Sequence, residues 1–93
     1  MSEREDESGR PALAEVLRAV GAEVNAAENR WPPMNSAHEA YAVLLEEVDE
    51  LKAHVWTNQK RRDMGAMRAE AIQVAAMAVR FVRDVCDGGR ASA

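Results

Sequence analysis

The sequence predicts an all-α protein: a helical bundle of three main helices per chain, completed by self-association. Apolar residues recur at steps of three and four along three segments, and no segment alternates in the manner of a strand. The 93 residues are 47% hydrophobic and 30% charged, which is typical of one globular helical domain. We expect this domain to span residues 10–87, between a flexible acidic tail at 1–9 and a second flexible tail at 88–93.

The first helix is expected to begin near Pro11, because proline is well tolerated in the first turn. Its apolar face is predicted from the following residues: Leu13, Val16, Leu17, Val20, Val24 and Ala27. Pro32 and Pro33 end this helix, since the residue before a proline is pushed out of the helical region of backbone space. Residues 30–33 are therefore expected to form an extended connector.

The second helix is expected to begin at a capping box formed by Ser36 and Glu39, in which each side chain accepts from the backbone N–H of the other residue. An apolar stripe follows at alternating steps of four and three: Ala37, Tyr41, Leu44, Val48, Leu51 and Val55. Polar and basic residues from 58 to 63 predict a loop. Asp63 is expected to be the N-cap of the next helix.

The third helix is predicted to run from about Met64 to Val85, with Gly88 and Gly89 as its stop signal. Its polar residues fall within one narrow sector: Glu70, Gln73, Arg80 and Asp84. Most of the remaining circumference is apolar, so this helix needs partners on more than one side. Two other helices of a short chain cannot easily supply them, and we therefore expect a homodimer or homotetramer.

Charge and composition exclude several classes of function. The formal net charge of −4 makes binding to a nucleic-acid polymer unfavourable. No apolar run approaches the roughly 20 residues that span a bilayer, and the N-terminus lacks the features of a signal peptide. We expect a cytoplasmic protein that does not contact membranes. The single cysteine, Cys86, cannot form an internal disulfide and is expected to be a small buried residue.

Four carboxylates lie within the five residues 46–50 of the second helix, where Glu47 and Glu50 are neighbours that repel one another. A solvated acidic face is one interpretation, and a cation that relieves the repulsion is the other. If the second and third helices pack antiparallel, this pair faces Glu70 and Gln73, because both pairs lie roughly ten residues from the loop. Oxygen ligands on rigid helices suit Mg²⁺, with Mn²⁺ as an alternative.

These residues resemble the EExxE…ExxD pattern of the MazG-like nucleoside triphosphate pyrophosphohydrolases. The matching segments are Glu46-Glu47-x-x-Glu50 and Glu70-x-x-Gln73. The resemblance covers about residues 36–86. It implies helical bundles that assemble as a homodimer or a dimer of dimers, bind Mg²⁺, and cleave a nucleoside triphosphate to a monophosphate and pyrophosphate.

Carried over residue by residue, the resemblance implies that Glu47, Glu50 and Glu70 bind metal. Glu46 and Glu47 would be the catalytic pair, with Glu46 positioning or activating water and Glu47 acting through the metal. Gln73 stands at the fourth ligand position, where the family has aspartate, and its amide supplies a neutral oxygen instead of a charge. Three functions stay open: a hydrolase, a catalytically weakened module that binds nucleotides or a protein partner, and a helical interaction protein without a ligand.

Four further residues are candidates for substrate binding. Arg80 shares the polar sector of the third helix with Gln73, so it could bind phosphate or instead pair with Asp84 one turn away. Lys60 and Arg61 could bind phosphate from the loop or could simply be solvated. Trp31 either contributes to the nucleotide pocket, as the resemblance implies for an aromatic residue near the first connector, or packs in the core.

Overall fold

The computed structural model describes residues 9–89, which fold entirely into helices and connections. The elements in chain order are α1 Leu13–Arg30, α2 Ala37–Val55, the 3₁₀ turn η1 Gln59–Arg61, α3 Met64–Phe81 and the π-helical turn η2 Val82–Cys86. The described residues contain no strand, so the all-α prediction is confirmed. No helix among them is long and apolar enough to cross a membrane.

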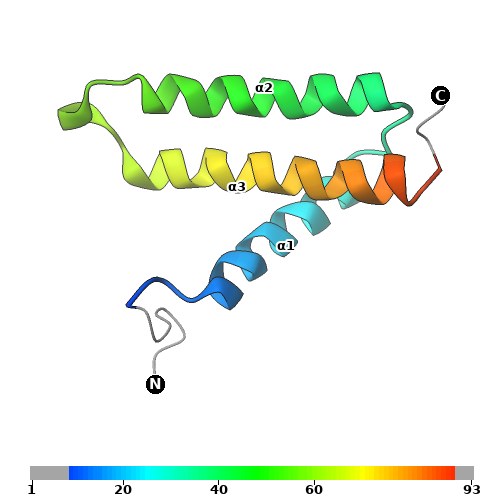
Figure 1. Ribbon diagram of the computed structural model, residues 1–93, viewed down its shortest axis with the longest axis horizontal. Coiled ribbons are helices and arrows are strands. Elements are labelled where there is room, and N and C mark those ends of the chain that lie inside the picture. Colours follow the sequence, from blue (N-terminus) through cyan, green and yellow to red (C-terminus); the bar gives the residue numbers. More distant parts are fainter. Residues whose placement is uncertain (1–8, 90–93) are drawn as a thin grey trace.

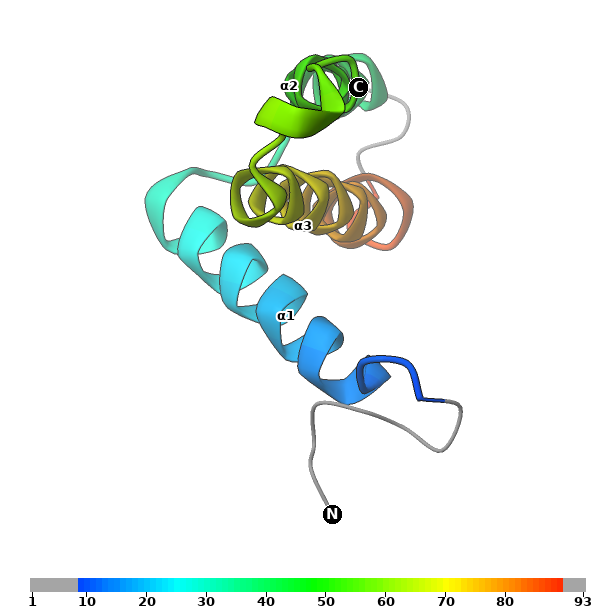
Figure 2. The same ribbon diagram turned by 90° about the vertical axis from the view of Figure 1, so that its left-hand side faces the viewer.

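α3 is the central helix of the fold. α2 and α3 lie side by side and run antiparallel, while α1 crosses α3 obliquely (Figure 1). Seen along α3, α1 and α2 lie on different sides of it and diverge (Figure 2). The two outer helices are joined only by the short connector between Arg30 and Ala37. This arrangement leaves a cleft between α1 and α2, with α3 along its floor.

The core is small and lies where α3 meets the other helices. Its buried apolar members are Val20, Val24, Met34, Ala40, Ile72, Ala76, Met77 and Val85. Ala40 on α2 and Ala76 on α3 are both completely buried. Because alanine is short, these two positions allow the backbones of packed helices to approach closely.

Both predicted N-caps are confirmed. Ser36 Oγ accepts a hydrogen bond of 3.0 Å from the Glu39 N–H, and Asp63 Oδ1 accepts one of 3.0 Å from the Ala66 N–H. The return arm of the capping box differs from the prediction, because Glu39 Oε2 accepts from the Asn35 N–H at 2.9 Å instead of from Ser36. The connector is thereby fastened to the first turn of α2.

The C-terminal stop signal is confirmed, since regular helix ends at Cys86 and turn residues follow. A Cβ atom at Gly88 would lie 2.4 Å from the Asp84 carbonyl oxygen, so only glycine fits this close approach. Gly89 has φ of 76°, in the left-handed region that glycine adopts without strain. Residues 1–8 and 90–93 of the predicted tails lie outside the described residues.

Several expectations about burial are wrong. Tyr41 and Val48, predicted to lie in the α2 contact stripe, are 60% and 38% exposed, because α2 turns the face of Ala40 toward α3. Cys86, predicted to be buried, is exposed in the last turn of η2. Pro11 lies before α1, which begins at Leu13 and has no side-chain cap.

Candidate metal and anion site

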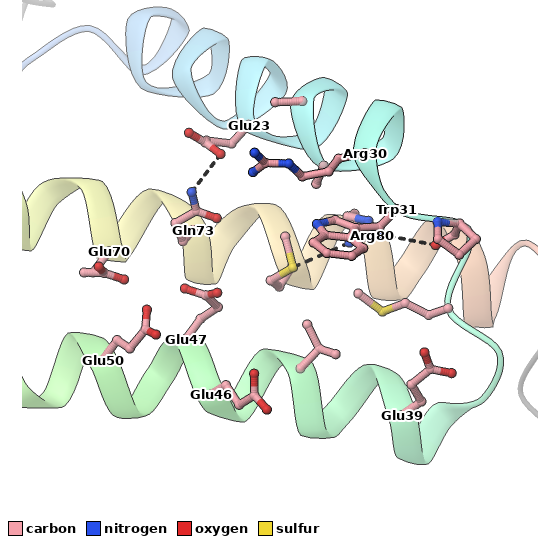
Figure 3. A pocket seen from close by; sticks show the side chains of 16 residues that line it. Glu23, Arg30, Trp31, Glu39, Glu46, Glu47, Glu50, Glu70, Gln73 and Arg80 are labelled. Carbon is pink, nitrogen blue, oxygen red and sulfur yellow. Dashed lines mark hydrogen bonds between the residues drawn. The ribbon is translucent and has the colours of Figure 1, made fainter.

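The cleft between α1 and α2 has a volume of about 870 Å³. Its walls come from α1, the connector, α2 and α3 (Figure 3). Eight charged residues line it: Glu23, Glu39, Glu46, Glu47, Glu50, Glu70, Arg30 and Arg80. With six carboxylates and two guanidinium groups, the cleft carries an excess of negative charge, which favours cations.

Three of these carboxylates form a cluster, hereafter the acidic trio: Glu47, Glu50 and Glu70. One oxygen from each lies within 4.8 Å of the others. Glu47 and Glu50 are one turn apart on α2, and Glu70 faces them from α3. The structure therefore brings together three of the four residues that the antiparallel register predicted to converge.

The acidic trio is electrostatically crowded. Burial, together with the nearby charges of Glu50 and Glu70, raises the pKa of Glu47 to about 6. Burial and the adjacent Glu50 carboxylate also raise the pKa of Glu70. In addition, Glu70 Oε2 is buried and has no hydrogen-bond partner. Carboxylates in this arrangement are stabilised by a shared proton or by a bound cation. A donor set made only of oxygens fits Mg²⁺ or Mn²⁺.

Gln73 lines the same cleft but its amide is already engaged. Gln73 Nε2 donates a hydrogen bond of 2.7 Å to Glu23 Oε2 on α1 (Figure 3). The sequence reasoning missed Glu23. A signal was present, because Glu23 lies one helical turn after Ala19 and one turn before Ala27, and both alanines pack against the core.

Arg80 is a buried cation without a carboxylate partner among the described residues. Its side chain is only 3% exposed, and its Nε atom has no hydrogen-bond partner. Nη2 donates to the Pro32 carbonyl oxygen at 3.2 Å, and Nη1 contacts Met77 Sδ at 3.8 Å. The alternative pairing with Asp84 is wrong, because Asp84 Oδ2 accepts from the Met34 N–H at 3.0 Å instead. A buried guanidinium with an N–H group left without an acceptor is suited to an anion.

Arg80 and the acidic trio lie toward opposite ends of the cleft. Ten residues of α3 separate Glu70 from Arg80, which corresponds to about 15 Å along the helix axis. Arg30, which the sequence reasoning also missed, lines the cleft from the last turn of α1, and its guanidinium points toward Glu23 (Figure 3). Trp31 lines the cleft beside Arg30 and is 60% exposed, so packing in the core is wrong for this residue. The acidic trio thus lies toward one end of the cleft and Arg80 toward the other, where Glu39 also lines it (Figure 3).

Two predicted substrate-binding residues lie elsewhere. Lys60 and Arg61 belong to η1, are exposed, and do not line the cleft. They lie in the connection between α2 and α3, so the structure does not bring them together with the other predicted site residues. Glu46, in contrast, does line the cleft, next to the acidic trio.

No protein-family model matches this chain, and no curated protein or solved structure matches it. The function is therefore argued from the residues of the cleft. Their arrangement can hold a divalent cation at one end and phosphate oxygens at both ends, which is the combination required by a polyphosphate.

Proposed function

We propose that this protein is a Mg²⁺-dependent nucleoside triphosphate pyrophosphohydrolase of the MazG-like type, which releases a nucleoside monophosphate and pyrophosphate. The observation that carries the proposal is the two-ended cleft. Three carboxylates with oxygens within 4.8 Å occupy one end, and the buried, unpaired Arg80 occupies the other. The motif resemblance of α2 and α3 supports the same reaction.

The residues of the cleft would have different roles in this reaction. Glu47, Glu50 and Glu70 would hold the cation, and Glu46 beside them would accept a proton from the attacking water. When bound, Mg²⁺ would neutralise phosphate oxygens and lower the pKa of water. Attack of water on the α-phosphorus forms one P–O bond and breaks the bond to the bridging oxygen, so that pyrophosphate leaves. Arg80 would donate to phosphate oxygens away from the acidic trio.

A binding or regulatory module is the second candidate, and one contact favours it. Gln73 provides an amide where the resembling family has a carboxylate, and the nitrogen of that amide is held by Glu23. The site therefore has the three carboxylates of the acidic trio and one neutral amide beside them. Such a site could bind a nucleotide with its cation while turning it over slowly or not at all.

A panel of nucleoside triphosphates with Mg²⁺ separates the two functions. We expect release of pyrophosphate and nucleoside monophosphate, with no orthophosphate, because attack occurs at the α-phosphorus. Chromatography of the products and a coupled pyrophosphate assay measure this directly. Calorimetric binding without pyrophosphate would favour the binding module. A protein that neither binds nor cleaves any member of the panel would contradict both.

We also propose that the functional form is a homodimer or a dimer of dimers. Among residues 9–89, eight apolar residues are buried, whereas eleven large apolar residues are exposed. On α2 an exposed line runs along Tyr41, Leu45 and Val48, at steps of four and three and away from α3. Apolar patches of this kind are uncommon on monomers, and a short chain buries too little surface to be robust alone.

Light scattering should therefore give at least twice the mass of one chain at micromolar concentration. Val48→Lys should shift the protein toward the monomer, because a charge would be placed within the exposed apolar line of α2. Asp49→Lys is a matched control, since it introduces the same side chain at the adjacent exposed position. A wild-type protein that stays monomeric and folded would contradict the proposed assembly.

A further inference from the structure

The contact between Glu23 and Gln73 joins α1 to α3 beside the acidic trio. Both side chains are partly buried and line the cleft, and the donor–acceptor distance is 2.7 Å. The Glu23 carboxylate points from α1 toward Gln73, and the Glu47 carboxylate lies on the opposite side of Gln73 (Figure 3). Gln73 therefore stands between a carboxylate of α1 and one of α2.

The contact fixes the orientation of the Gln73 amide. A carboxylate accepts hydrogen bonds and cannot donate them when ionised, so only the amide nitrogen can face Glu23. With the amide held in this way, its oxygen remains available as a neutral ligand. Gln73 lies one turn after Glu70 on the same face of α3, so it is the residue of α3 next to the acidic trio in this direction.

Glu23 also adds charge where charge is already crowded. For a purely structural hydrogen bond between α1 and α3, a neutral glutamine at position 23 would serve without repelling the other carboxylates of the cleft. Within the acidic trio, Glu70 Oε2 is buried without a hydrogen-bond partner among the described residues, which indicates that a ligand is missing at this point of the cleft. A carboxylate at position 23 becomes favourable once a cation is bound.

We propose that Glu23 is a positioning residue of the cation site and supplies, from α1, the negative charge that Gln73 does not carry. The inference rests on the cation site of the proposed function. Glu23 holds the Gln73 amide nitrogen, the Gln73 oxygen faces the cation, and the charge of Glu23 acts on the cation through this amide. The site then keeps four negative charges, those of Glu23, Glu47, Glu50 and Glu70, although Gln73 itself is neutral.

Calorimetric titration with Mn²⁺ alone tests the proposed role of Glu23. Glu23→Gln should weaken Mn²⁺ binding by about tenfold or more, the usual range for a residue that orients a metal ligand. The melting temperature of the metal-free variant should change little or rise, because the glutamine oxygen can still accept from Gln73 Nε2 while one repulsive charge is lost. Glu15→Gln is the matched control: it removes a carboxylate from α1 outside the cleft and should leave Mn²⁺ affinity unchanged.

The double variant Glu23→Gln with Gln73→Glu provides the rescue. It keeps one carboxylate and one amide in contact and should restore Mn²⁺ affinity to within about threefold of wild type, as expected for two coupled residues. Unchanged Mn²⁺ affinity in Glu23→Gln, with clear binding by wild type, would overturn this inference and leave the proposed function standing. A double variant as weak as the single one would also overturn it. Wild-type protein that binds no Mn²⁺ would overturn the proposed cation site itself.

Discussion

Arg80→Met should lower the rate of pyrophosphate release by about two orders of magnitude, because two charge-assisted hydrogen bonds to phosphate are worth about 3 kcal/mol together. Methionine has a similar length and fills the same buried space without charge. Stability should fall only modestly, since the Pro32 carbonyl oxygen loses its one hydrogen bond from Arg80 while a buried charge is removed. Steady-state kinetics and thermal melting measure the two effects separately.

Arg83→Met is the matched control for this prediction. Arg83 lies one helical turn after Arg80. It is exposed, does not line the main cleft, and pairs with Glu28 at 3.0 Å. Activity should survive this change. Equal losses in both variants would indicate that general positive charge matters and not the buried guanidinium. An active Arg80→Met protein would remove Arg80 from the substrate site.

The sequence predicts the parts of the fold that depend on local chemistry. Ser36 and Asp63 cap their helices as expected, since the capping interaction involves residues only three positions apart. The proximity of Glu47 and Glu70 also follows from the sequence, because a short loop makes two helices antiparallel and thereby fixes the pairing of residues at equal distance from it.

The sequence does not predict how α1 packs. The connector allows α1 to cross α3 at many angles, and the angle decides whether Glu23 meets Gln73 and whether Arg30 joins the cleft. A contact between residues 50 positions apart in the sequence, such as that between Glu23 and Gln73, depends on this packing. The sequence contains only an indirect sign of it. In the case of Glu23, this sign is a charged residue one helical turn from Ala19 and from Ala27, which pack against the core.

The sequence also does not predict which face of α2 contacts α3. α2 carries apolar residues on two sides, and Leu44 lies between the predicted stripe through Tyr41 and Val48 and the face of Ala40. The structure buries Ala40 completely, because a small residue permits close packing against α3. This choice turns Glu47 toward α3 and the cleft, and leaves Tyr41 and Val48 for a further partner.

Contacts with the connector hold the end of the cleft that contains Arg80 in one arrangement. Arg80 donates to the Pro32 carbonyl oxygen, and Asp84 accepts from the Met34 N–H. Two side chains from the end of the α3–η2 helix therefore hold both sides of Pro33. Prolines limit the conformations of this segment before it folds, so little further entropy is lost when it is fastened. The result is a fixed wall beside Trp31 and Arg30.

The largest effect on stability is expected for the cation itself. Mg²⁺ at about 100 times its dissociation constant should stabilise the folded protein by about 2.7 kcal/mol, because the unfolded chain cannot assemble the acidic trio. For a domain of this size, that corresponds to a rise in melting temperature of about 10–20 °C. Thermal melting with and without Mg²⁺ measures this rise.

Glu50→Gln should abolish the rise and pyrophosphate release together, since it removes one of the three carboxylates whose oxygens lie within 4.8 Å. Asp49→Asn removes the same charge from the adjacent residue, which is exposed and does not line the cleft, and should leave both quantities near wild type. The two variants distinguish a specific cation site from general attraction of cations to an acidic helix face. Without a specific site, the loss of either carboxylate would have the same effect. If Mg²⁺ stabilises the two variants to the same degree, the acidic trio is only a solvated surface, and the proposed hydrolysis has no place to occur.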